Sequence, residues 1–263
     1  MLSKEYTSAG PVPDCRLIGR WFDELQLYVA PSCNMLCNFC SKGSDCISNG
    51  NNPTCLSRAM TPRQAVNWAE LSVARDSRIK VVKITGPGEP LFNLQTFEVL
   101  KRLKPRLPGI IPAVSTNGLL LEEKAEELAR LGVKMVDIAI NAVSSDIMMK
   151  LYSKLILPGN VLAGTHEMAR LLHKAQFEGL KKCLGLGMTV KINSVYFPGV
   201  NDEDILQVAK ECISLGDVSM CIISGFPGGK LARLRPPALW EMSDLRNRVG
   251  RIIPEIQLKT FYQ

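Results

Sequence analysis

The chain has 263 residues, a length that fits one large α/β domain and is too short for two ordinary enzymatic domains with a linker. Hydrophobic residues make up 46% and charged residues 22%, which excludes a disordered chain and indicates a substantial core. The net charge of +7 arises without runs of Lys or Arg interleaved with aromatics, so we expect no nucleic-acid binding. No apolar run reaches the length of a membrane span and Met1–Tyr6 lacks a secretory pattern, so we expect a cytoplasmic protein without membrane contact.

Short apolar runs alternate with longer amphipathic segments, a pattern typical of parallel strands covered by helices. We expect strands at Leu27–Ala30, Lys80–Thr85, Ile110–Ser115, Lys134–Ile140, Thr189–Val195 and Val218–Ser224. We expect helices at Thr61–Asp76, Leu94–Lys104, Glu122–Leu131, Asp146–Leu151, Val161–Gly185, Asp202–Leu215 and Ser243–Val249. Six successive βα units with right-handed crossovers predict a partial, open-sided (β/α)6 barrel of the TIM-like type. A six-stranded doubly wound sheet is the structural alternative.

Domain boundaries follow from composition. Residues 1–25 are interpreted as an N-terminal lead-in, broken by Gly10–Pro13, and residues 26–250 as the barrel domain, followed by a C-terminal tail at 251–263. The Gly-, Asn- and Ser-rich stretch Ser41–Arg58 is interpreted as a long loop after the first strand. Long loops inside compact domains are usually functional.

The cysteines are concentrated near the N-terminus. Six of the nine fall in the first 55 residues: Cys15, Cys33, Cys37, Cys40, Cys46 and Cys55. Disulfides are not expected in a reducing compartment, and such clustering favours metal or iron–sulfur chemistry.

Cys33, Cys37 and Cys40 are spaced CxxxCxxC directly after the first strand, and can bind one corner of a 4Fe-4S cubane. Cubanes normally take four cysteines, so three leave one iron for a non-protein ligand. A zinc site is the weaker alternative, because zinc ligands more often come as paired CxxC elements.

Cysteine or polar side chains follow five successive strands, and the first of these strands is followed by the cysteine loop. The second strand ends in the Gly-rich turn Gly86–Pro90, and such a turn lets the backbone approach a ligand closely. The third ends in Ser115–Gly118, the fourth in Asn141, and the fifth carries Asn193. Any one of these is equally well explained as a strand-end cap, but together they favour a ligand site at the carboxyl ends of the barrel strands.

These motifs resemble the radical S-adenosylmethionine (SAM) superfamily. Phe39 precedes the last loop cysteine, and Gly88-Glu89-Pro90 matches the family's Gly-Gly-Glu-Pro motif, although Pro87 stands where its first Gly would be. The resemblance implies that the open iron chelates SAM, and that one-electron reduction cleaves SAM to methionine and a 5′-deoxyadenosyl radical, which abstracts hydrogen from the substrate. It also implies the following SAM-binding residues: Phe39, Gly86, Gly88, Glu89, Ser115, Thr116, Asn117, Asn141 and Asn193.

A narrower resemblance covers roughly residues 28–250. The phrases VAPSCNMLCNFC, ITGPGEP, STNGL, INAV, EGLKKC and KINSVYFPGVND are similar to the NifB family, the maturases of the nitrogenase iron–molybdenum cofactor. This implies a lyase- or transferase-type enzyme of cofactor biosynthesis in nitrogen fixation, which fuses two 4Fe-4S precursors and inserts a carbide from a SAM methyl group. The implied partners are an electron donor such as a ferredoxin or flavodoxin, and iron–sulfur scaffold or carrier proteins.

The family's additional cluster ligands are only partly present. Cys46 keeps its place and Cys15 is near that of an N-terminal ligand, while Cys55 is a candidate replacement. Ala113–Val114 stands where a cysteine usually precedes Ser-Thr-Asn-Gly, and Glu24–Tyr28 lacks the expected histidine. The chain also ends without the family's terminal cysteine pair. Cys15, Cys46 and Cys55 are therefore candidate ligands of one auxiliary iron–sulfur cluster, with ordinary loop thiols as the alternative.

Two other functions remain open. The missing ligands favour a radical SAM enzyme that modifies an organic or peptidyl substrate without auxiliary clusters, and a non-catalytic carrier of a cluster or zinc needs no turnover. Gly225–Lys230 (GFPGGK) lacks the spacing of a phosphate loop and is expected to close the sixth strand, where the family contacts SAM or substrate. Cys183 and Cys221 are expected to be buried packing residues.

Overall fold

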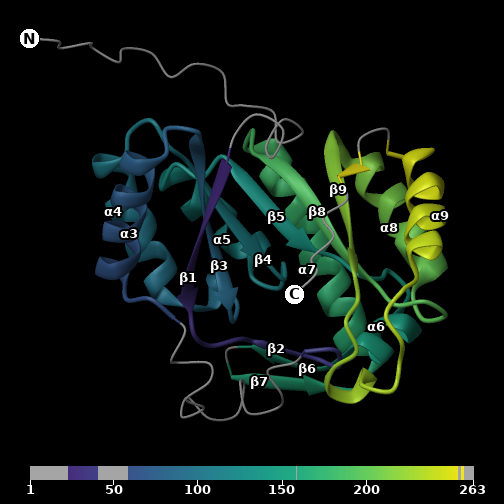
Figure 1. The fold of residues 1–263 in the computed structure, drawn as a ribbon. Helices are drawn as coiled ribbons and strands as arrows, with labels where there is room; N and C mark the ends of the chain where they lie inside the picture. Colours follow the sequence, from purple (N-terminus) through teal and green to yellow (C-terminus); the bar gives the residue numbers. More distant parts are fainter. Residues whose placement is uncertain (1–22, 41–58, 158, 254–255, 258–263) are drawn as a thin grey trace, which may run out of the picture.

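A curved parallel sheet organises the computed structural model, which describes residues 23–40, 59–157, 159–253 and 256–257 (Figure 1). Its strands are β1 (Asp23–Ala30), β3 (Ile79–Pro87), β4 (Ile111–Thr116), β5 (Met135–Ala139), β8 (Thr189–Tyr196), β9 (Val218–Ser224) and the short β10 (Ile256–Gln257). All neighbouring strands pair in parallel, in the order β1-β3-β4-β5-β8-β9-β10. The order never reverses, whereas a doubly wound sheet reverses at a switch point. The partial barrel is therefore confirmed, and the six expected strands are its long ones.

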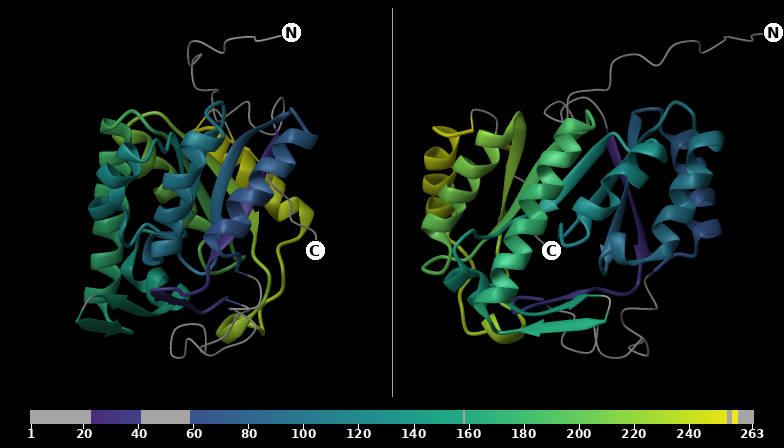
Figure 2. Two further views of the ribbon diagram at one scale, coloured as in Figure 1. Left: turned by 90° about the vertical axis from the view of Figure 1, so that its left-hand side faces the viewer. Right: turned by 180° about the vertical axis from the view of Figure 1, so that it is seen from behind.

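Helices cover the outside of the barrel, as the views from the side and from behind show (Figure 2). They are α3 (Pro62–Arg75), α4 (Leu94–Arg106), α5 (Leu121–Arg130), α6 (Ser145–Leu151), α7 (His166–Gly185), α8 (Asp202–Leu215) and α9 (Leu239–Gly250). A capping box starts α3: the Thr61 side chain accepts from the Gln64 amide, and the Gln64 side chain accepts from the Thr61 amide. None of the described helices is both long and apolar enough to cross a bilayer.

A small antiparallel sheet lies across the carboxyl ends of the barrel strands, at the bottom of Figure 1. It consists of β2 (Met35–Cys37), β6 (Tyr152–Leu157) and β7 (Asn160–Ala163), in that order. The expected helix start at Val161 is wrong: β7 occupies that position, and α7 begins at His166, capped by the Thr165 side chain. Leu162 of β7 pairs with Leu155 of β6, so pairing with β6 selects a strand where the local pattern predicted a helix.

The barrel strands have two different faces because side chains alternate along a strand. Residues such as Val82, Ile84, Val136, Ile138, Val190 and Ile192 are buried in the main core between sheet and helices. Between them stand Lys83, Asp137 and Lys191, which therefore face the interior of the barrel. The lumen carries charged side chains, while the helix-facing side is apolar.

Candidate functional site

The loop with the three predicted cluster ligands joins β1 to β2 at the carboxyl rim of the barrel. Cys33, Cys37 and Cys40 are each partly exposed, and none of them forms a disulfide with another described cysteine. Burial raises the pKa of the Cys37 thiol, and the nearby sulfurs of Cys33 and Cys40 raise it further. The three sulfurs are thus close enough to interact electrostatically, and a positively charged group among them is what would favour their thiolates.

Donor chemistry and access both fit an iron–sulfur cluster at this loop. Thiolates are the usual ligands of such clusters, and in a cubane each cysteine binds a different iron, so the sulfurs need not meet at one ion. Among the residues that the structure describes, no three His, Cys, Asp or Glu side chains surround a single point as ligands of one metal ion.

Asn34 and Asn38 fix the conformation of this loop from within. The Asn34 side chain is fully buried, and its Oδ1 accepts from Asn117 Nδ2 at 2.8 Å. Asn38 is held on two sides: its amide donates to the Leu151 carbonyl at 2.7 Å, and its Nδ2 to the Lys150 carbonyl at 2.9 Å. The loop is thereby attached to the turn after β4 and to the end of α6.

Phe39, a predicted SAM contact, packs inward against two aromatic rings. Its ring centroid lies 5.3 Å from that of Phe197 and 6.2 Å from that of Tyr152. Both partners are buried, and Tyr152 is the register partner of Cys37 in the small sheet. Phe39 therefore holds the cysteine loop against the rim, because a buried aromatic pair fixes the orientation of both rings.

The turn after β3 approaches the cysteine loop with its backbone. The Gly88 amide donates to the Ala30 carbonyl at 2.6 Å, and the Glu89 amide donates to the Ser32 carbonyl at 2.8 Å. A Cβ at Gly88 would lie 2.0 Å from the Ser32 oxygen, so no other residue fits without moving the loop. Asn93 closes the arrangement by donating from Nδ2 to the carbonyls of Ser32 and Glu89. We call this close backbone packing of Gly88 against Ser32 the Gly88 cradle. It leaves no space for a side chain at Gly88, directly beside Cys33.

Glu89 connects this turn to the end of β4. Its carboxylate accepts from the Thr116 hydroxyl at 2.5 Å, from the Asn117 amide at 2.7 Å and from the Leu91 amide at 3.0 Å. Burial raises the pKa of Glu89 to about 7, although these hydrogen bonds act to lower it. The predicted SAM contacts Glu89, Thr116 and Asn117 are thus brought together, with Glu89 serving as the internal brace between two rim turns.

Asn141 joins the barrel rim to the small sheet. Its side chain is buried, donates to the Tyr152 hydroxyl at 2.8 Å and accepts from the Val195 amide at 2.7 Å. Asn201, which was not predicted as a site residue, donates to the backbone carbonyls of Asn141 and Val195. The INAV and PGVND phrases therefore form one bracket between the ends of β5 and β8.

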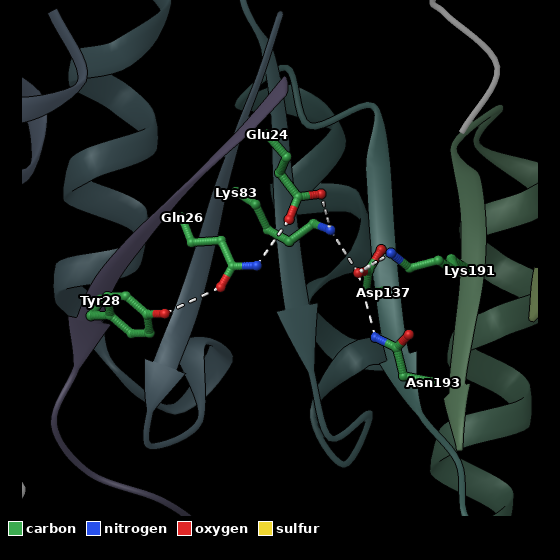
Figure 3. A network of polar contacts seen from close by, with 7 residues as sticks. All are labelled: Glu24, Gln26, Tyr28, Lys83, Asp137, Lys191 and Asn193. Carbon is green, nitrogen blue, oxygen red and sulfur yellow. Dashed lines mark hydrogen bonds and ion pairs between the residues drawn. The ribbon is translucent and has the colours of Figure 1, made fainter. Parts of the chain in front are cut away.

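The remaining predicted SAM contacts line the rim or the lumen. Gly86 is the last residue of β3 before Pro87, and Ser115 lies on the lumenal face of β4, one residue from buried Val114. Asn193 points into the barrel from β8 and donates to Asp137 at 3.4 Å (Figure 3).

A network of charged and polar residues crosses the barrel interior and was missed by the sequence analysis (Figure 3). Lys83 Nζ lies 2.5 Å from Glu24 Oε2 and 2.7 Å from Asp137 Oδ2, and Lys191 Nζ lies 2.8 Å from the same Asp137 oxygen. Burial alone would raise the pKa of Asp137, but the two ammonium groups hold it below its usual range. The network joins β1, β3, β5 and β8 around the lumen.

The other predicted cysteines fall into two groups. Cys15, Cys46 and Cys55 lie outside the described residues, so their ligand role stays a prediction. Cys183 and Cys221 are fully buried, as expected, and so is Cys212. Cys221 alternates with core-facing Met220 and Ile222, which places it on the lumenal face of β9.

Comparison with known proteins identifies the family. A family model for the radical SAM superfamily matches residues 27–212. The FeMo cofactor biosynthesis protein NifB of Methanocaldococcus jannaschii is 32% identical over 233 residues, covering 89% of this chain and 77% of that protein. The NifB of Azotobacter vinelandii is 36% identical over 191 residues, covering 72% of this chain and 38% of that protein. The chain thus spans three quarters of this archaeal relative and less than half of this bacterial one.

Solved structures show the same fold. SuiB of Streptococcus suis bound to S-adenosylmethionine superposes with a TM-score of 0.63 at 19% identity, covering 92% of this chain and 51% of SuiB. A radical SAM methyltransferase from Sphaerobacter thermophilus gives a TM-score of 0.61 at 20% identity, covering 91% of this chain and 66% of that protein. The chain belongs to the radical SAM superfamily and, within it, to the NifB family, whose shared cofactors are a 4Fe-4S cluster and SAM.

Proposed function

We propose that the chain is a cytoplasmic, NifB-like radical SAM enzyme that acts in the biosynthesis of an iron–sulfur metallocofactor of the nitrogenase type. One observation carries the proposal: the three loop sulfurs, the Gly88 cradle and the Glu89 brace share one rim of the barrel. The relatives that match most of this chain are FeMo cofactor biosynthesis proteins.

In this proposal the rim residues divide the work of binding. Cys33, Cys37 and Cys40 hold the cluster, which, with SAM, supplies one-electron cleavage of a carbon–sulfur bond. The bare backbone at Gly88 lets the cysteine loop pack directly on the turn after β3, and Phe39 holds this loop against the rim. Thr116 and Asn117 keep the Glu89 carboxylate in place by hydrogen bonding.

The lumen beyond the rim is the proposed place of substrate. Ser115 of β4, Asn141 after β5 and Asn193 of β8 lie near the carboxyl ends of three strands. The Lys83–Asp137–Lys191 network forms a polar wall deeper in the barrel. Because every charge in this wall has an opposite partner, the wall keeps its shape without a ligand.

The proposal also includes partners and a second cluster. An electron donor such as a ferredoxin or flavodoxin reduces the cluster, and iron–sulfur scaffold or carrier proteins deliver precursors. Cys15, Cys46 and Cys55 hold an auxiliary cluster between them. Support for this last part comes from sequence position alone.

Iron counting after anaerobic reconstitution tests the function. We expect more than four irons per chain and S-adenosylhomocysteine alongside 5′-deoxyadenosine, because methyl transfer precedes radical chemistry in this proposal. The Cys46→Ser/Cys55→Ser variant should lose the iron above four while keeping SAM cleavage. Four irons in wild-type protein, with 5′-deoxyadenosine as the sole nucleoside product, would contradict the cofactor-maturase function.

One observation favours a second function, the modification of an organic or peptidyl substrate without auxiliary clusters. Ala113 and Val114 stand where the family's cysteine precedes Ser-Thr-Asn-Gly, and Ala113 packs with Val81 and Met135, so the barrel wall is apolar at this position. The same iron count decides between the two functions. The second function requires four irons per chain, and the Cys46→Ser/Cys55→Ser variant should then contain as much iron as the wild type.

A further inference from the structure

Two segments contact the cysteine loop, and both carry positive charges that no carboxylate of the described residues neutralises. Residues 147–157 contain two lysines and no acid, and residues 225–240 contain three basic residues and no acid. Arg235 pairs with Glu241. Lys150, Lys154, Lys230 and Arg233 have no carboxylate within ion-pair distance among the residues that the structure describes, and we call these four the cationic rim.

The cationic rim adjoins the loop through Asn38. The Asn38 amide and side chain donate to the backbone of Leu151 and Lys150, and its carbonyl accepts from the Leu231 amide at 3.1 Å. Lys154 is the register partner of Leu36 in the small sheet. The two basic segments therefore both contact Asn38, the residue after Cys37.

Residues 228–231 approach this loop with no intervening side chain. Gly229 has a φ of +51°, and a Cβ there would lie 2.6 Å from the Asn38 oxygen and 3.2 Å from the Cys40 oxygen. Next to it, Lys230 and Arg233 are exposed, and the Phe226 side chain is 52% exposed. The segment that contacts the cysteine loop therefore carries exposed Arg233 and Phe226, and arginine and aromatic side chains are enriched in protein contact sites.

We propose that the cationic rim is the docking surface for an acidic one-electron carrier protein of the ferredoxin type. The inference rests on the proposed function, because it requires a cluster at Cys33, Cys37 and Cys40. One electron leaves the donor's reduced iron–sulfur centre and enters the enzyme's cluster; the donor is oxidised by one electron, the cluster is reduced by one, and no atom moves. The positive rim accelerates encounter with a negative partner and orients it with its redox centre toward the loop.

Cluster reduction kinetics test the docking surface. The reconstituted wild type is mixed anaerobically with a reduced, acidic ferredoxin at low ionic strength, and the loss of cluster absorbance is followed. The charge reversal Lys230→Glu/Arg233→Glu should slow the second-order rate roughly tenfold and flatten its salt dependence, because rim charges act mainly on association. Reduction by dithionite, which needs no protein contact, should keep its wild-type rate.

Matched controls separate the outcomes. Lys101→Glu/Lys210→Glu makes the same charge change at exposed positions of α4 and α8 and should leave ferredoxin-driven reduction within twofold of wild type. Equal rates for the rim variant and wild type, or equal slowing by the control, would overturn the docking surface while leaving the proposed function intact. Wild-type protein without a reducible 4Fe-4S cluster would overturn both.

Discussion

Lys83 on β3 and Asp137 on β5 form an ion pair inside the barrel, with Nζ 2.7 Å from Oδ2 and each residue no more than 3% exposed. Buried pairs of this kind contribute little net stability, yet removal of one partner leaves an unpaired buried charge. Glu24 and Lys191 extend the pair, so each charge on β1, β3, β5 and β8 depends on its neighbours.

Replacement of Lys83 by Met should therefore destabilise the fold by about 3–5 kcal/mol, because Glu24 loses its ammonium partner and Asp137 keeps one of two. Urea unfolding of the variant against wild type measures this. Lys101→Met removes an exposed charge on α4 and should change stability by less than about 0.5 kcal/mol. A Lys83→Met loss no larger than that of Lys101→Met would show that the pair is not buried in solution.

The same network predicts a pH dependence. The folded-state pKa of Asp137 lies below its unfolded value, so its contribution to stability is fully present above the unfolded pKa and is lost as pH falls through the folded one. In Lys83→Met the folded pKa of Asp137 should rise, and acid unfolding should begin at higher pH. Acid titrations followed by circular dichroism should show this shift, and an unchanged midpoint would contradict it.

Gly88→Ala tests the cradle beside the cysteine loop. The new Cβ would meet the Ser32 carbonyl at 2.0 Å, so we expect a loss of about 1–3 kcal/mol and displacement of the loop from Gly88. Cluster occupancy after reconstitution should fall with it. Gly109→Ala is the control, since no atom lies within 4 Å of the Cβ position there. Equal stability and occupancy in the two variants would argue against close approach at Gly88.

Glu89→Gln tests the brace between the turns after β3 and β4. Both oxygens of its carboxylate accept hydrogen bonds, three in all. In glutamine the NH2 group replaces one oxygen, so it would face at least one of these donors without an acceptor between them. We expect about 1–3 kcal/mol of destabilisation and weaker SAM binding, measured by thermal unfolding and by calorimetric titration of the reconstituted protein. The exposed Glu98→Gln on α4 should leave both quantities near wild type.

The sequence predicted the barrel well because its signals are local. The apolar runs from Val81 to Ile84 and from Val190 to Ile192, with helices between them, suffice to indicate parallel strands and a polar carboxyl rim. The small sheet was missed because it pairs Met35 with Leu155, residues far apart in sequence, and a four-residue strand such as β7 carries almost no periodicity of its own.

The lumenal network was missed although a signal existed. In β1, the polar residues Glu24, Gln26 and Tyr28 alternate with Leu25, Leu27 and Val29, and this period of two also shows that the strand begins before Leu27. Lys83, Asp137 and Lys191 each interrupt an apolar run by a single residue. Which lysine pairs with which acid depends on strand register, which the sequence does not determine.

The most direct test of the account is the iron content and electron paramagnetic resonance of anaerobically reconstituted protein, with and without SAM. We predict a reduced four-iron cluster whose spectrum changes when SAM binds, and whose signal disappears in each of Cys33→Ala, Cys37→Ala and Cys40→Ala but persists in Cys183→Ala. Zinc bound by the loop sulfurs in place of iron, or a cluster signal indifferent to all three substitutions, would contradict the assignment of this rim as the cofactor site.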